Sequence, residues 1–136
     1  MKLKVHESVF VPLAKWSMLC AGNYRCVQAD GMRPIKDAVH SDLEASRAVY
    51  EWVVKLCISL GADARDLVPF EKYANAALSL LTPSSAARAL ANGAPNIERV
   101  DRLVQIISKA QGVQLAELDK TVSLVDGWLE KNRKKA

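Results

Sequence analysis

The stretch Ser84-Ser-Ala-Ala-Arg-Ala-Leu-Ala-Asn-Gly-Ala-Pro-Asn-Ile-Glu98 predicts the end of one helix and the start of the next. A serine hydroxyl can accept a hydrogen bond from a free backbone N–H, so Ser84 is the expected N-cap of a helix that runs to Asn92. Gly93 is expected to end that helix, because glycine readily adopts the left-handed conformation after a last helical turn. Asn96 is the expected cap of the following helix.

The segments on both sides of this stretch also have helical periodicity, and none shows a clean strand alternation. Glycine or proline stands near most of the expected ends. The short segment 34–39 is expected to form only a helical turn, and the other segments form five or six main helices. Helical segments are expected over residues 7–28, 34–39, 41–60, 70–81, 84–92, 97–110 and 115–129. The sequence therefore predicts an all-α fold in a single domain that covers residues 1–136.

Local patterns add detail to three of these helices. Ser41-Asp-Leu-Glu44 has the form of a capping box, in which serine and glutamate satisfy each other's backbone N–H groups. The final helix has apolar residues in steps of three and four, which predicts a buried seam along it. That seam comprises Leu115, Leu118, Val122, Val125 and Leu129. The expected buried stripe of the helix before it comprises Ile97, Val100, Leu103, Val104, Ile107 and Ala110.

Composition excludes several classes of protein. The 136 residues are half hydrophobic and carry a net charge of +4, which is ordinary for a globular domain. The basic tail Lys131–Lys135 is expected to be a solvated helix end, so nucleic-acid binding is not predicted. No apolar run is long enough for a membrane span, no signal peptide is recognisable, and the odd cysteine count fits reduced thiols. We therefore expect a cytoplasmic protein without a metal site or a membrane contact.

The sequence contains none of the common catalytic motifs. It has no glycine-rich dinucleotide loop, no nucleophile elbow and no His-Glu-x-x-His pair. What remains are polar residues beside apolar stripes: Lys15 and Asn23 on the first helix, Ser84 and Ser85 at a helix start, and Glu98 beside the next helix start. Each has a structural explanation when taken alone, as a lysine covering the core edge, a helix cap or a first-turn acid.

Together, however, these positions resemble the C-terminal helical domain of the ketopantoate reductase (2-dehydropantoate 2-reductase) family, a domain similar to that of 6-phosphogluconate dehydrogenases. The resemblance covers nearly the whole chain. It departs from the family at Leu19, where the family has an asparagine, and at Ile97, where counting from the proline places the family's glutamate. The matching residues, in order, are Lys15-Trp16, Asn23, Leu60-Gly61, Ser84-Ser85, Gly93-Ala94-Pro95, Glu98 and Gly112-Val113.

The resemblance implies a function that this chain would perform only with a second, nucleotide-binding domain. Lys15 would be the catalytic proton donor in the reduction of a 2-keto acid by NADP(H), and Glu98 would orient the substrate or the lysine. Asn23, Ser84 and Ser85 would bind the substrate. NADP would bind mainly to a Rossmann domain, which the sequence does not contain.

Two alternatives stay open on sequence alone. The chain could be a stand-alone helical interaction module, such as a homodimer, that keeps the fold without the chemistry; Leu19 and Ile97 motivate this interpretation. It could also be a small-molecule or regulatory binding domain without hydride transfer.

Overall fold

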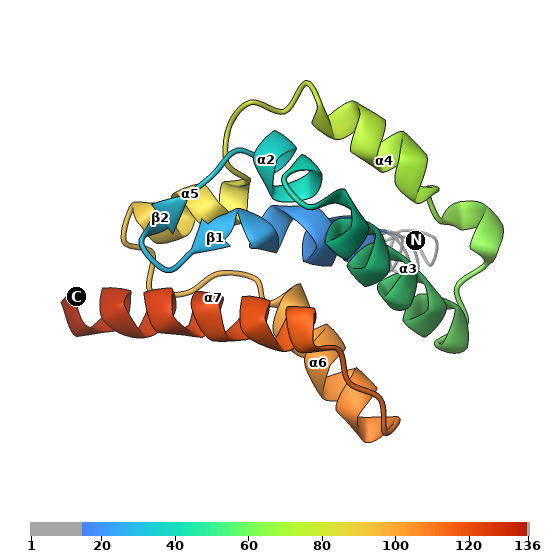
Figure 1. Cartoon of the computed structure of the whole chain (residues 1–136). Helices are drawn as coiled ribbons and strands as arrows, with labels where there is room; N and C mark the ends of the chain where they lie inside the picture. The colour runs from blue at the N-terminus through green and yellow to red at the C-terminus, as the bar shows by residue number, and fades with distance from the viewer. Residues whose placement is uncertain (1–14, 136) are drawn as a thin grey trace, which may run out of the picture.

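The computed structural model describes residues 15–135, and this part of the chain is mostly helical, as the sequence predicts (Figure 1). A helical segment that includes residues 15–18 continues into a π-helical turn, η1, and a 3₁₀ turn, η2. A two-stranded antiparallel hairpin follows, in which Val27 is paired with Met32. The elements are η1 (Leu19–Asn23), η2 (Tyr24–Cys26), β1 (Val27–Gln28), β2 (Gly31–Met32), α2 (Ile35–His40), α3 (Leu43–Ser59), η3 (Ala64–Asp66), α4 (Phe70–Ala77), α5 (Ser85–Ala91), α6 (Val100–Ala110) and α7 (Ala116–Lys135).

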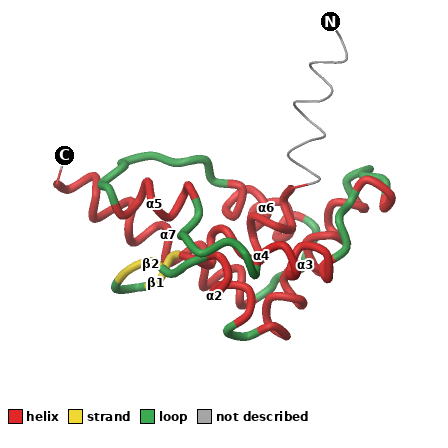
Figure 2. The backbone as a smooth tube through the Cα atoms, turned by 90° about the horizontal axis from the view of Figure 1, so that it is seen from above, coloured by secondary structure: helices red, strands yellow, loops and turns green. Residues whose placement is uncertain are grey.

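The segment formed by η1 and η2 lies at the centre of the molecule. η1 contacts α2, α3, α5 and α6, and η2 contacts α2, α5 and α7. In Figure 1 this segment runs between α2 and α3 on one side and α6 and α7 on the other. Figure 2 shows α5 and the hairpin toward the end of the molecule where α7 finishes. None of the described helices is long and apolar enough to cross a membrane.

The three cysteines lie in the core, as expected of cysteines on apolar helix faces. Cys20, Cys26 and Cys57 are all buried among aliphatic and aromatic side chains. Burial raises the pKa of each thiol, in the case of Cys57 to about 11. Because the thiolate is the reactive form, these cysteines have a structural role in the described fold.

The first helix ends earlier than predicted. We expected it to reach Gln28, but the chain leaves the helical conformation after Cys26 and forms the hairpin. Trp128, a hundred residues away, donates a hydrogen bond from Nε1 to the Gln28 carbonyl oxygen at 2.7 Å. A tertiary contact of this kind overrides local helical preference. The predicted residues 7–14 of this helix lie outside the described part of the chain.

Two other predicted boundaries are wrong. The cap of α3 is Asp42, whose Oδ1 accepts from the Ala45 N–H at 3.1 Å, and not the predicted Ser41, which follows the last turn of α2. A carboxylate one residue nearer the helix takes the role that we assigned to the serine. α4 ends at Ala77 and not at the predicted Leu81, and an exposed connection follows it.

The start of α6 also differs from the prediction. Asn96 does not cap it, because its Oδ1 accepts from Nη2 of Arg133 at 3.1 Å, and the helix begins only at Val100. The predicted stripe is correct for Val100 and Val104, but Leu103 and Ala110 are exposed. Asp101 and Ser108 are buried instead.

Other parts of the prediction are confirmed. Ser84 caps α5, and its Oγ accepts from the Ala87 N–H at 3.2 Å. Positive φ angles occur at Gly61, Gly93 and Gly112, each following a helix as predicted. The seam of α7 is buried at Leu118, Val122, Val125 and Leu129.

Candidate functional site

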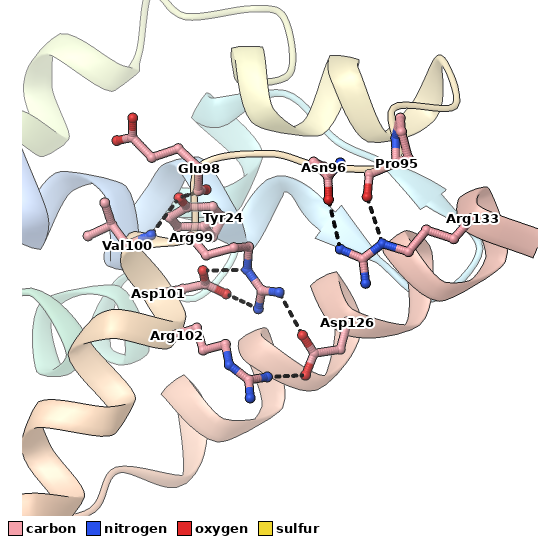
Figure 3. Close-up of polar contacts among 10 residues, drawn as sticks. All are labelled: Tyr24, Pro95, Asn96, Glu98, Arg99, Val100, Asp101, Arg102, Asp126 and Arg133. Atoms are coloured by element: carbon pink, nitrogen blue, oxygen red, sulfur yellow. Dashed lines mark hydrogen bonds and ion pairs between the residues drawn. The ribbon is translucent and has the colours of Figure 1, made fainter. Parts of the chain in front are cut away.

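The turn at Asn23 and Tyr24 brings together three of the five predicted site residues. The Ser84 hydroxyl donates to the Asn23 carbonyl oxygen at 2.7 Å, across 61 residues of sequence. The Tyr24 hydroxyl donates to the Glu98 carbonyl oxygen and accepts from the Val100 N–H at 3.0 Å (Figure 3). The fold therefore holds Asn23, Ser84 and Glu98 around one short segment.

Backbone geometry positions this turn. Asn23 is the last residue of the π-helical turn, and such turns are frequent at functional sites. Gly22 precedes it, and a Cβ at this position would lie 1.9 Å from the Tyr73 hydroxyl, so only glycine fits there. The same hydroxyl lies 3.2 Å from the Met18 carbonyl oxygen and 3.5 Å from Asn23 Oδ1. The π-helical turn interrupts the regular α-helical spacing between Lys15 and Asn23.

The predicted side chains differ in their access to solvent. Lys15, Ser85 and Glu98 are exposed, and Asn23 is half-buried. Ser84 is buried, and its hydroxyl both donates and accepts within the fold. Among the described residues no hydrogen bond or ion pair holds the Glu98 carboxylate, and Figure 3 shows it directed away from the neighbouring ion pairs. The Ser85 hydroxyl accepts from Arg88 Nη2 at 3.3 Å, and no hydrogen bond or ion pair between described residues joins Lys15 to the other four. Ser84 supports the turn.

Beside this turn lies an ion network centred on Arg99, which we call the Arg99 network (Arg99, Asp101, Arg102 and Asp126; Figure 3). Arg99 donates from Nε and Nη2 to the two oxygens of the fully buried Asp101, at 2.9 and 3.0 Å. Its third nitrogen, Nη1, donates to Asp126 at 2.6 Å, and Arg102 also pairs with Asp126 at 3.5 Å. Burial alone would lower the pKa of Arg99, but the hydrogen bonds to Asp101 and Asp126 raise it above its ordinary value. All three guanidinium nitrogens are used, so the network joins α6 to α7.

A cavity of about 440 Å³ lies between the hairpin, the start of α3 and α7. We call it the polar cavity. None of the five predicted site residues lines it, and no group of three metal-ligating side chains occurs in the described part of the chain. Its lining comprises Arg25, Val27, Gln28, Ala29, Asp30, Arg33, Ser41, Asp42, Glu117, Lys120, Thr121 and Leu124.

Arg25 is the most buried charged side chain of the polar cavity, and only some of its N–H groups have hydrogen-bond partners. Nη1 donates to the Ser46 hydroxyl at 2.5 Å and to the Ala21 carbonyl at 3.4 Å. Nη2 lies 3.9 Å from a Glu117 oxygen, which is an ion pair but not a hydrogen bond. No described residue bonds to Nε. Burial, as the main cause, lowers the pKa of Arg25. Sequence reasoning missed this residue, because an arginine between a tyrosine and a cysteine carries no motif.

A second cavity of about 230 Å³ adjoins the first along α7, and we call it the apolar annex. It shares Ala29 and Leu124 with the polar cavity. Its other lining residues are Ser123, Gly127, Trp128 and Lys131.

Comparison with known proteins returns no relative of this chain: no family model, no curated protein and no solved structure matches it. Any assignment of function therefore depends on the residues and on their arrangement.

Proposed function

We propose that this chain is the substrate-binding domain of a ketopantoate-reductase-like, NADP-dependent oxidoreductase, which reduces a 2-keto acid together with a nucleotide-binding domain. The observation that carries the proposal is the gathering of Asn23, Ser84 and Glu98 around one turn, although they come from three distant parts of the sequence. The mostly helical fold is the kind that such a domain requires.

Each residue has a role in this proposal. NADPH, bound to the second domain, supplies the hydride that reduces the 2-keto carbon. Lys15 gives a proton from Nζ to the 2-keto oxygen, so that the product is a 2-hydroxy acid. Asn23 and Ser85 bind polar groups of the substrate, and the Glu98 carboxylate orients it. Ser84 is a positioning residue, because its hydroxyl holds the Asn23 carbonyl and not the substrate.

Because Lys15 is exposed in this chain, the proposed chemistry needs the second domain to remove Lys15 from water. A lysine is an efficient proton donor near neutral pH when removal from water lowers its pKa. Lys15 is exposed in this chain. The proposal therefore requires the nucleotide-binding domain to cover Lys15 when the two domains assemble.

The test is an NMR titration of the ¹⁵N-labelled chain with 2-ketopantoate as the probe. We expect shifts at the amides of Asn23, Ser85 and Glu98, and weaker binding by the Glu98→Gln variant. Glu44→Gln is the matched control, because Glu44 is an exposed carboxylate at the start of α3. No shift at millimolar ligand, or shifts confined to other surfaces, would contradict the proposal.

One observation favours a second candidate, a stand-alone dimerisation module. Large apolar side chains are exposed at and just after the end of α3, and along and just after α6, with Ile106 55% exposed. These two helix ends lie together, since Gln111 donates to the Ser59 hydroxyl at 3.4 Å. The exposed side chains are Ile58, Leu60, Leu103, Ile106 and Val113.

Sedimentation distinguishes this candidate from the reductase proposal. A homodimer at micromolar concentration that Ile106→Lys dissociates would support it, whereas a monomer throughout would remove it. A stand-alone module without the chemistry is also expected to give no amide shifts with 2-ketopantoate, in contrast to the reductase domain.

A further inference from the structure

The polar cavity contains a buried cation whose donors are only partly used. A guanidinium has five N–H groups, and its burial costs free energy unless these groups have hydrogen-bond acceptors. Among the described residues, Trp16 Nε1 is the one fully buried side-chain nitrogen or oxygen atom without a hydrogen-bond partner. The nitrogen atoms of Arg25 that lack a hydrogen-bond partner therefore keep some exposure, and Arg25 lines the polar cavity.

A second arginine, Arg33, also lines the polar cavity. Arg33 donates from Nε to the Arg25 carbonyl at 3.0 Å and from Nη1 to the Ser41 hydroxyl at 3.0 Å, which leaves its Nη2 without a described partner. After burial, the charge of Arg33 is a further cause that lowers the pKa of Arg25, while Glu117 and Asp42 oppose it. The remaining charged side chains of the lining are Lys120 and Asp30. Arg25 and Arg33 each have a nitrogen atom without a hydrogen-bond partner among the described residues. Such an arginine is suited to a planar anion, because a carboxylate accepts two parallel N–H bonds from one guanidinium.

The apolar annex extends this site toward one end of α7. Trp128 is held in place by its hydrogen bond to the Gln28 carbonyl, and Lys131 Nζ lies 5.0 Å from the centre of its ring. Gly127 leaves open space, since a Cβ there would meet no atom within 4 Å. An apolar group therefore fits between Leu124 and Trp128, next to the polar cavity.

We propose that the polar cavity and the apolar annex together bind a small carboxylate that carries an apolar ring. The carboxylate pairs with Arg25 and Arg33, and the ring lies over Leu124, Gly127 and Trp128. The polar cavity alone has the size of small-molecule sites, which are roughly 300–1,000 Å³. This site is separate from the residues assigned to the 2-keto acid and does not depend on the reductase proposal.

Calorimetry with matched probes tests the chemistry. The probe is 3-phenylpropionate, and its comparators are 3-phenylpropan-1-ol, which lacks the charge, and propionate, which lacks the ring. We expect 3-phenylpropionate to bind at least about tenfold more tightly than either comparator. Phenyl phosphate distinguishes a carboxylate site from a phosphate site, since tighter binding of phenyl phosphate would overturn the carboxylate assignment.

Substitutions at Gly127 test the location. Gly127→Leu fills the apolar annex and is expected to weaken 3-phenylpropionate binding by about tenfold or more. Gly127→Ala is the control, because it leaves most of the apolar annex open and is expected to leave 3-phenylpropionate binding unchanged. Arg33→Gln is expected to weaken 3-phenylpropionate binding and to leave 3-phenylpropan-1-ol binding unchanged. Equal binding of the acid and the alcohol, or binding that neither Gly127→Leu nor Arg33→Gln changes, would overturn the proposal.

Discussion

Arg25 is a buried arginine in the central segment and Arg99 a half-buried one beside it, and their surroundings differ. Arg25 is 8% exposed and Arg99 is 17% exposed, so the more buried of the two has the poorer set of partners. Arg99 uses all three nitrogens on carboxylates, whereas Arg25 has one neutral hydroxyl, one long carbonyl contact and a carboxylate at 3.9 Å. Their pKa values move in opposite directions: burial lowers that of Arg25, and the carboxylate bonds raise that of Arg99 in spite of burial.

This difference distinguishes an arginine that stabilises the fold from one that is suited to bind a ligand. A buried charge is tolerated when it is paired and hydrogen-bonded, and the Arg99 network meets that condition within the chain. Arg25 meets it only in part within the described residues, because its ion pair is long and its Nε has no partner, and it lines a cavity. We therefore assign Arg99 to the stability of the α6–α7 junction and Arg25 to a ligand.

The largest expected effect comes from Arg99→Met. It leaves the fully buried Asp101 carboxylate without its counterion, which costs about 3–5 kcal/mol in similar buried pairs. Urea denaturation measures the loss of unfolding free energy. The double variant Arg99→Met with Asp101→Leu should recover most of it, because no lone charge remains buried. A loss in the double variant as large as in the single one would contradict this explanation.

Tyr24→Phe is expected to have the next largest effect. It removes the hydroxyl that joins the Glu98 carbonyl to the Val100 N–H and leaves both groups without that partner. The expected loss is about 1–3 kcal/mol. The same variant should shift the amide resonances of Glu98 and Val100 more than those of α4, as an NMR spectrum will show. Unchanged stability would mean that the turn does not position Glu98.

Arg25→Met should cost less, about 1 kcal/mol, since it removes one good hydrogen bond and also the cost of burying the charge. Ser46 keeps a bond to the Val39 carbonyl at 2.8 Å, and Glu117 is 43% exposed and can be solvated. Urea denaturation of this variant beside Arg99→Met compares the two arginines directly. A loss as large as that of Arg99→Met would remove the distinction between them.

The smallest expected effect is on the stability of the protein at acidic pH. Hydrogen bonds from Gln105 and Gln114 lower the pKa of Asp119 below its ordinary value of 3.8. A lowered carboxylate pKa contributes stability above the ordinary value, and this contribution is lost as the pH falls toward the folded value. Asp119→Asn should therefore lose a small amount of stability at neutral pH and show a weaker acid dependence below pH 3.8. Asp37→Asn, a change at an exposed carboxylate in α2, is the control. An unchanged acid profile in Asp119→Asn would contradict the assignment.

The sequence predicted most of the helices, because capping residues and apolar periodicity are local signals. The glycines after α3, α5 and α6, and the seam of α7, follow from such signals. It did not predict the hairpin, whose Gln28 carbonyl is held by Trp128 a hundred residues away, or the late start of α6, where Arg133 binds Asn96. Of the candidate sites, the one around Asn23 consists of residues that the sequence analysis named, and their role in binding stays a prediction. The polar cavity at Arg25 was not predicted, since a cavity between distant elements leaves no pattern in the sequence.

The most direct test of the difference between the two arginines is an NMR spectrum of the arginine Nε–Hε groups recorded during a titration with 3-phenylpropionate. We predict that the Arg25 signal shifts with ligand concentration, and that the Arg99 signal, already bonded to Asp101, stays in place. An Arg25 signal that does not respond to the ligand would contradict the account, as would equal shifts of both signals.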